Sequence, residues 1–201
     1  GVASVPGNFY LYIDINSIPE LNAGTEFHEV IFTPSDTVNY TSASTSVSVT
    51  VAQAASVIYT APTASGIFLG QTLGDSILSG GSASVPGTFA FDSPTTEPSI
   101  GTASHTVVFT PTDSANYTSA STSVSVTVTL NTSIYVDFNT GTPSGIGTVN
   151  DPIDSINVAL MHVAPGGTIN INAGTSPEII LIDQPVTLVR SGVSGNVLIG
   201  N

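Results

Sequence analysis

The sequence NYTSASTSVSVTV stands at residues 39–51 and again, letter for letter, at residues 116–128. An internal copy this exact identifies a tandem repeat before any other feature is weighed. The similarity extends upstream, because Ser4-Val5-Pro6-Gly7 returns as Ser84-Val85-Pro86-Gly87. The copies are 77 positions apart at the rear (116 − 39) and 80 at the front (84 − 4), so the first has three extra residues. These fall around 15–22, where we expect a surface loop that tolerates an insertion.

The alignment predicts that the first copy is incomplete. Residues 55–83 precede the Ser-Val-Pro-Gly of the second copy, whereas three residues precede that of the first. Two explanations stand side by side at this stage. Either the sequence is a piece of something longer, or another chain supplies the strands that the first copy lacks.

The composition restricts the partners. The 201 residues include a single Arg, no Lys, no Cys and 14 acidic residues, for a formal net charge of −13. Such a chain repels phosphate backbones and anionic lipid, so we expect neither nucleic acid nor a membrane surface as partner. No apolar run reaches the length of a membrane span, and no signal peptide opens the sequence. We therefore expect no membrane insertion in this segment, and any export signal or anchor would lie outside it.

Alternation of apolar and hydroxyl side chains predicts half-buried strands. In residues 122–130, valines and a leucine alternate with Ser and Thr, so one face is buried and the other is wet. Short strands with a turn signal every ten residues or so are typical of an all-β sandwich. The predicted core of the second copy consists of Phe89, Phe91, Val107, Phe109, Tyr117, Val124, Val126 and Val128.

The pattern Pro-x-Asp-x-x-Asn-Tyr occurs at 34–40 and again at 111–117, between two predicted strands. The Asp–Asn pair could be a ligand site. A turn closed by Asp and Asn side chains is the alternative, with a Tyr whose hydroxyl bonds to backbone as in a tyrosine corner. Recurrence of the whole pattern at a strand junction favours the turn.

These motifs together resemble a bacterial immunoglobulin-like repeat. The resemblance is carried by Gly70-Gln71-Thr72-Leu73, Ser84-Val85-Pro86-Gly87-Thr88-Phe89, Val108-Phe109-Thr110-Pro111-Thr112-Asp113, Asn116-Tyr117 and Val124-Ser125-Val126-Thr127-Val128. It implies an incomplete sandwich over residues 1–53 and a complete one over 54–131. Such repeats occur in large secreted and surface-anchored proteins. Membership implies a spacer or adhesive role and brings no catalytic residue with it.

The pattern changes at Ser133. A short strand, residues 134–137, precedes a loop rich in Gly, Thr, Pro and Ser. Asp151 then suits the N-cap and Pro152 the first position of a helix that we predict over 153–163. Short apolar strands are expected after it at Thr168–Ile171, Glu178–Ile182, Val186–Val189 and Val197–Ile199.

Residues 132–201 resemble the N-terminal cap and first coils of a right-handed parallel β-helix of the pectate-lyase-like kind. The resemblance rests on Ile134-Tyr135-Val136-Asp137, the predicted helix, Ala164-Pro165-Gly166-Gly167-Thr168-Ile169, Ala173-Gly174-Thr175 and Pro185-Val186-Thr187-Leu188. Many such β-helices are polysaccharide lyases or hydrolases. A lyase needs a basic residue to take a proton and carboxylate-held calcium. Arg190 is the single basic side chain of that kind, so we predict no enzyme, no catalytic residue and no cofactor.

Calcium is the one metal that the sequence suggests. Asp137, Asn139 and Gly141 have the alternating spacing with which a calcium loop begins, and Asp151 and Asp154 follow downstream. The alternative is a cap loop held by Asx turns. We do not expect His28, His105 or His162 to bind metal, because none has a partner at ligand spacing.

The sequence therefore predicts an all-β, secreted or cell-surface segment: tandem Ig-like sandwiches followed by the start of a parallel β-helix. Its expected function is structural or adhesive, as spacer or stalk. The expected partners are neighbouring modules of the same or an identical chain, with a surface glycan or protein ligand possible. Two alternatives are a filament subunit assembled by strand complementation and an accessory region of a glycan-active β-helix enzyme. Glycosylation is left open at the Asn-x-Ser/Thr sites Asn39, Asn116 and Asn131.

Overall fold

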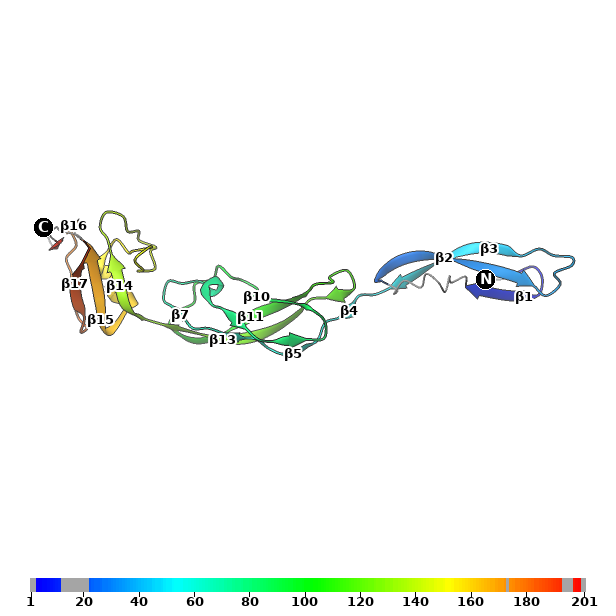
Figure 1. Cartoon of the computed structure of the whole chain (residues 1–201), viewed down its shortest axis with the longest axis horizontal. Coiled ribbons are helices and arrows are strands. Elements are labelled where there is room, and N and C mark those ends of the chain that lie inside the picture. The colour runs from blue at the N-terminus through cyan, green and yellow to red at the C-terminus, as the bar shows by residue number, and fades with distance from the viewer. Residues whose placement is uncertain (1–2, 12–21, 173, 193–196, 200–201) are drawn as a thin grey trace. The chain divides into compact units, whose positions relative to one another are not determined.

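The computed structural model describes residues 3–11, 22–172, 174–192 and 197–199 (Figure 1). Strands predominate, and α1 (Ile156–His162) is the α-helix of the described residues, which confirms the all-β class. The chain groups into two compact units. The first comprises 1–57, 83–88 and 109–120, and the second comprises 58–82, 89–108 and 121–201. This division runs through the second repeat, and the domain limits at 53 and 131 stay predictions.

An antiparallel sheet in the order β1-β2-β3 dominates the first unit. Its strands are β1 (Gly7–Leu11), β2 (Gly24–Pro34) and β3 (Ala43–Val51). The register places Phe9 opposite Phe32 and His28 opposite Val47. The turn between β2 and β3 is the predicted Pro-x-Asp-x-x-Asn-Tyr turn. A second pair, β4 (Ala54–Ala55) with β12 (Tyr117–Thr118), is parallel.

Equivalent positions of the two repeats make the same local contacts. The backbone N–H of Ser35 donates to the carbonyl of Pro6 at 2.9 Å, and that of Thr112 donates to the carbonyl of Pro86 at 2.9 Å. A Cβ on Gly7 would lie 2.4 Å from the Phe32 ring, and a Cβ on Gly87 would lie 2.4 Å from the Phe109 ring. The turn glycine is thus required in each repeat because an aromatic ring packs directly against it.

The sheet of the second repeat has four strands in the order β10-β11-β13-β7. They are β10 (Gly87–Phe91), β11 (Gly101–Pro111), β13 (Ala120–Thr129) and β7 (Ile67–Phe68). Around β7 lie β5 (Ile58–Thr60), β6 (Thr63–Ala64), the 3-10 turn η1 (Leu73–Asp75), β8 (Leu78–Ser79) and β9 (Ser82–Ala83). β6 pairs with β8 and β5 with β9.

Residues 58–82 of the second unit, which include β7, form what we call the covering segment. A compact hydrophobic core lies between this segment and the sheet. It consists of Ile67, Leu73, Phe91, Val107, Val124, Val126 and Val128, with Ala64, Leu69, Leu78 and Phe89 packed against it. The predicted core of the second repeat is largely confirmed. Phe109 is buried as well, whereas Phe89 and Tyr117 are only half-buried.

The C-terminal part of the second unit is built on parallel strands in the order β14-β15-β17. These are β14 (Asn131–Val136), β15 (Val163–Asn172) and β17 (Thr187–Ser191), while β16 (Gly174–Ser176) pairs in parallel with β18 (Val197–Ile199). Ile134, Ile169 and Leu188 are in register across three strands. The core here consists of Ile134, Val136, Ile153, Ile156, Ala159, Val163, Ile169 and Ile171.

The helix prediction was wrong at its beginning. Ser155, not Asp151, is the N-cap, because its Oγ accepts a hydrogen bond from the N–H of Val158 at 3.2 Å. Ile153, predicted as helical, instead bridges to β14: its N–H donates to the carbonyl of Tyr135 at 3.0 Å. The backbone of Ile153 is therefore paired with β14. Because a residue in this pairing cannot also be helical, α1 starts only after Ile153.

The predicted strand at Glu178–Ile182 is absent, since residues 177–183 have no strand assignment. The carboxylate of Glu178 instead accepts hydrogen bonds from the N–H of Ile156 at 3.0 Å and from the hydroxyls of Ser155 and Ser176. Its carboxylate thereby satisfies the free N–H of Ile156 at the start of α1. This contact fixes the segment beside the helix rather than in a sheet.

Candidate interaction surface

One face of the β1-β2-β3 sheet carries apolar side chains that are exposed to solvent. Phe9 is 47% exposed, Leu11 46% and Val47 39%. Their counterparts in the second repeat are Phe89, Phe91 and Val124, of which Phe91 is 8% and Val124 6% exposed. Similar residues at matching positions of nearly the same sequence are thus open in the first repeat and covered in the second.

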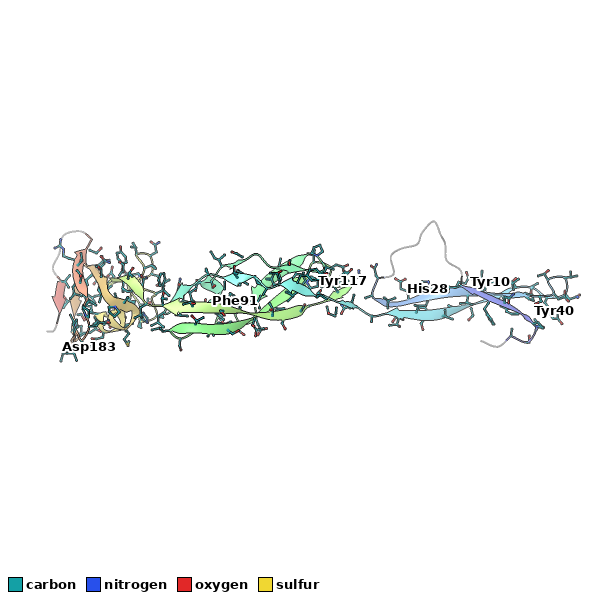
Figure 2. The ribbon with its side chains drawn as sticks, turned by 90° about the horizontal axis from the view of Figure 1, so that it is seen from below. Tyr10, His28, Tyr40, Phe91, Tyr117 and Asp183 are labelled. Carbon is teal, nitrogen blue, oxygen red and sulfur yellow. The ribbon has the colours of Figure 1, made fainter. Side chains whose placement is uncertain are left out.

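A hollow of about 470 Å³ lies on this bare face. Its floor includes Phe9, Val30 and Phe32, and the rings of Phe9 and Phe32 are tilted against each other with centroids 5.1 Å apart. Tyr40 and Val5 line its margin. Figure 2 labels Tyr10 and His28 on this sheet and Tyr40 at its turn. The lining also includes Ser4, Asn39, Thr41, Ser44 and Thr45, so apolar side chains and hydroxyl or amide groups share this hollow.

The outer edge of β3 is the second part of this surface. In the second repeat the equivalent strand, β13, pairs in parallel with β7, where Val128 lies opposite Ile67. The N–H of Leu69 also donates to the carbonyl of Thr129 at 3.0 Å. Among the described residues of the first unit, no strand occupies the corresponding edge of β3. An unpaired edge is a template for strand addition.

Each predicted Asp–Asn turn is closed by its own side chains. The amide of Asn39 donates to Asp36 Oδ2 at 2.8 Å, and that of Asn116 donates to Asp113 Oδ2 at 2.7 Å. The hydrogen bonds from the Asn39 side chain and backbone hold the pKa of the Asp36 carboxyl below its usual value. These internal bonds favour the turn interpretation over a ligand site.

The turn of the second repeat makes further contacts within the first unit. Asn116 Oδ1 accepts from the N–H of Ala23 at 2.6 Å, and its amide donates to Asn22 Oδ1 at 2.9 Å. The side-chain amide of Gln53 donates to the carbonyl of Ser114 at 2.8 Å, beside the β4–β12 pair. We call these hydrogen bonds of Asn116 and Gln53 the linker–turn contact. It was not predicted from the sequence. No sequence signal points to it, because Asn39 occurs in the same motif and bonds to its own turn.

The predicted tyrosine corner is not observed. The N–H of Tyr117 donates to the carbonyl of Asp113 at 3.1 Å, but within the described residues its hydroxyl has no hydrogen-bond partner. The ring is half-buried, so water can reach the hydroxyl. Tyr117→Phe should therefore leave stability nearly unchanged, in contrast to the loss of about 1 kcal/mol expected of a buried bond.

The predicted calcium residues lie around the loop that follows β14. Asp137 Oδ1 accepts from the N–H groups of Asn139 at 2.9 Å and Thr140 at 3.2 Å, which is an Asx turn, and Oδ2 accepts from the Asn172 amide at 2.8 Å. Burial raises the pKa of the Asp137 carboxyl, but these hydrogen bonds outweigh it and keep the pKa below the ordinary value.

Two of the other candidate residues make local hydrogen bonds, Asp151 through its carboxylate and Asp154 through its backbone. Asp151 Oδ2 accepts from the N–H of Ile146 at 3.2 Å, and the N–H of Asp154 donates to the carbonyl of Thr142 at 3.3 Å. In the described ranges no three His, Cys, Asp or Glu side chains gather as a metal site would require. Calcium binding at Asp137, Asn139, Asp151 and Asp154 stays a prediction, for which a melting temperature that calcium raises and EDTA restores is the test.

The histidines lie apart. His28 is opposite Val47 on the bare sheet, and its counterpart His105 has an Nε2 that is buried without a partner in the described structure. His162, in the last turn of α1, has a buried Nδ1 in the same situation, and burial lowers its pKa. His105 and His162 are thus partly buried side chains, and within the described residues none of the three histidines belongs to a metal-ligand cluster.

Comparison with protein-family models, curated proteins and solved structures found no match to this chain. In the part of the chain that the structure describes, no helix has the length and apolar character needed to cross a membrane.

Proposed function

We propose that this chain is a non-catalytic structural or adhesive segment of an extracellular or cell-surface repeat protein, acting as spacer or stalk. The observation that carries the proposal is the linker–turn contact. Ala23 and Gln53, which flank strands of the first sheet, are hydrogen-bonded to the turn of the second repeat. Ala23 bonds to Asn116, and Gln53 bonds to Ser114. A tandem array whose repeats are hydrogen-bonded at the junction transmits force along the chain, which is what a spacer does.

Two features support the finer fold assignment. An Ig-like sandwich is supported by the β10-β11-β13 strands, whose apolar side chains pack against Ile67 and Leu73 of the segment around β7. The start of a parallel β-helix is supported by the ladder β14-β15-β17, in which Ile134, Ile169 and Leu188 stack in register. The 14 acidic residues against one Arg suit a protein whose surface is solvated rather than paired to polyanions.

The test of the proposal combines a mechanical and a chemical measurement on the whole chain. Pulled from its two ends, the chain should show the second repeat unfolding in one cooperative step, as its continuous core predicts. Incubated with uronate and neutral polysaccharides, with and without calcium, it should release no product. Turnover that disappears with Arg190→Ala would overturn the non-catalytic role. Unfolding without any discrete step would overturn the mechanical one.

Two other functions each have one supporting feature. The parallel ladder is compatible with an accessory region of a glycan-active β-helix enzyme, and binding of a polysaccharide without cleavage would favour it. The bare sheet is compatible with a filament subunit assembled by strand complementation. Concentration-dependent growth of the purified chain, followed by light scattering, would favour the filament.

A further inference from the structure

We propose that a hollow beside β11 in the second repeat binds a neutral monosaccharide unit, such as the terminal residue of a surface glycan. This inference deepens the adhesive side of the proposed function and rests on it. The hollow has a volume of about 260 Å³ and is lined by Leu73, Asp92, Ser93, Thr96, Ser104, His105 and Thr106. Cavities for drug-sized ligands commonly begin at about 300 Å³, so this one is suited to a single sugar ring.

The imidazole of His105 is the first indication of a ligand. His105 lies on the same face of β11 as the core residues Val107 and Phe109. Its Nε2 is buried, and no hydrogen-bond partner for it is present among the described residues. Because a buried polar atom without a partner is costly, a ligand hydroxyl in the hollow would stabilise this arrangement.

The walls of the hollow are fixed by backbone hydrogen bonds. The N–H of Leu73 donates to the carbonyl of Thr96 at 2.9 Å, which holds η1 against the loop 92–96. The N–H of Asp92 donates to the carbonyl of Thr106 at 3.1 Å, which holds the start of this loop against β11. A hollow whose walls are already in place loses little conformational entropy on binding a small ligand.

The chemistry of the lining identifies the class of ligand. Asp92 provides a carboxylate that accepts hydrogen bonds, Ser93 and Thr96 provide hydroxyls that donate and accept, and the buried Leu73 provides an apolar wall. A sugar presents hydroxyls around its ring and C–H groups on its faces, so it matches both kinds of surface. The Asp92 carboxylate and the net charge of −13 disfavour an anionic ligand.

The first repeat keeps the histidine but not the groups around it. His28 corresponds to His105, 77 positions on. Four lining residues have counterparts of different chemistry in the first repeat: Phe27 for Ser104, Glu29 for Thr106, Tyr12 for Asp92 and Ile13 for Ser93. The carboxylate and hydroxyl set therefore belongs to the second repeat, and His28 is an internal control for His105.

The test uses the full chain, with free glucose, galactose and mannose as probes and the histidine imidazole resonances followed by NMR. At least one of these sugars should shift the His105 resonances in a saturable way, whereas those of His28 should not move. Asp92→Asn and Ser93→Ala should each weaken binding by roughly tenfold, the worth of one hydrogen bond to a sugar hydroxyl. Asp183→Asn and Ser125→Ala, at exposed positions outside the hollow, are the matched controls and should leave the affinity unchanged.

Glucuronate should bind less tightly than glucose, because its carboxylate would meet that of Asp92. The site would be overturned if none of the sugars shifts His105, if His28 shifts equally, or if the shift is confined to His162. Affinity that survives Asp92→Asn and Ser93→Ala together would overturn it as well, and glucuronate binding as tightly as glucose would overturn the neutral class of ligand. The spacer role fails separately, in the pulling experiment.

Discussion

At the scale of single residues, Asn116 and Asn39 occupy equivalent positions of the two repeats, so substituting each one measures the effect of their different hydrogen bonds. Both close their own turn, but Asn116 also bonds to Asn22 and Ala23. Asn116→Ala should therefore lower the free energy of unfolding by about 1 kcal/mol more than Asn39→Ala does, which is the usual worth of such bonds. Urea unfolding of the two variants measures the difference. Equal losses would show that the linker–turn contact contributes nothing.

Asp137 provides a pH-dependent contribution with a defined sign. Its folded-state pKa lies below the unfolded value of about 3.8 because Asn172, Asn139 and Thr140 donate to the carboxylate. The contribution is fully present above that value and is lost as pH falls through the lower, folded-state pKa.

Asn172→Ala removes one of these donors, so the Asp137 pKa should rise and acid unfolding should begin at a higher pH. Carboxyl NMR of Asp137 and acid titration of the fold follow both effects. Asn150→Ala, at an exposed loop position, is the matched control. An unsubstituted chain in which Asp137 titrates at its ordinary value would contradict the account.

At the scale of elements, strands β3 and β13 have the same sequence but differ in how far their side chains are buried. Val124 is 6% exposed and Val47 is 39% exposed, although the thirteen residues around each are identical. Val124→Ala should cost roughly 2 kcal/mol and Val47→Ala less than roughly 1 kcal/mol, because only the first leaves a cavity. Urea unfolding of the two variants compares them, and equal costs would mean that the two faces are equally covered.

The elements also show what a sequence can predict. Alternating Val and Ser or Thr was sufficient for β3 and β13, because a period of two has no other reading. The start of α1 was missed because Ile153 pairs with Tyr135, a residue distant in sequence. The strand expected at 178–182 was missed because Glu178 binds the helix N-terminus. Local propensity contains neither of these tertiary contacts.

The same limit applies to the candidate site. The alignment alone predicts that residues 1–53 contain no counterpart of β7, and the described residues of the first sheet show β1, β2 and β3 without one. The linker–turn contact was not, since Asn116 and Asn39 are indistinguishable in sequence and differ only in what lies beside them. The tyrosine-corner bond was expected from motif similarity and is not formed by Tyr117, which shows that a motif predicts a turn more securely than it predicts a side-chain partner.

At the scale of the whole molecule, the central claim is that one repeated sequence folds twice: its apolar face is covered in the second repeat and, among the described residues, uncovered in the first. Amide hydrogen exchange tests this most directly, because residues 39–51 and 116–128 have the same intrinsic exchange rates. NMR should show the amides of Val124, Val126 and Val128 exchanging at least roughly tenfold more slowly than those of Val47, Val49 and Val51, a difference of about 1.4 kcal/mol. Equal protection in the two copies, or greater protection in the first, would contradict it.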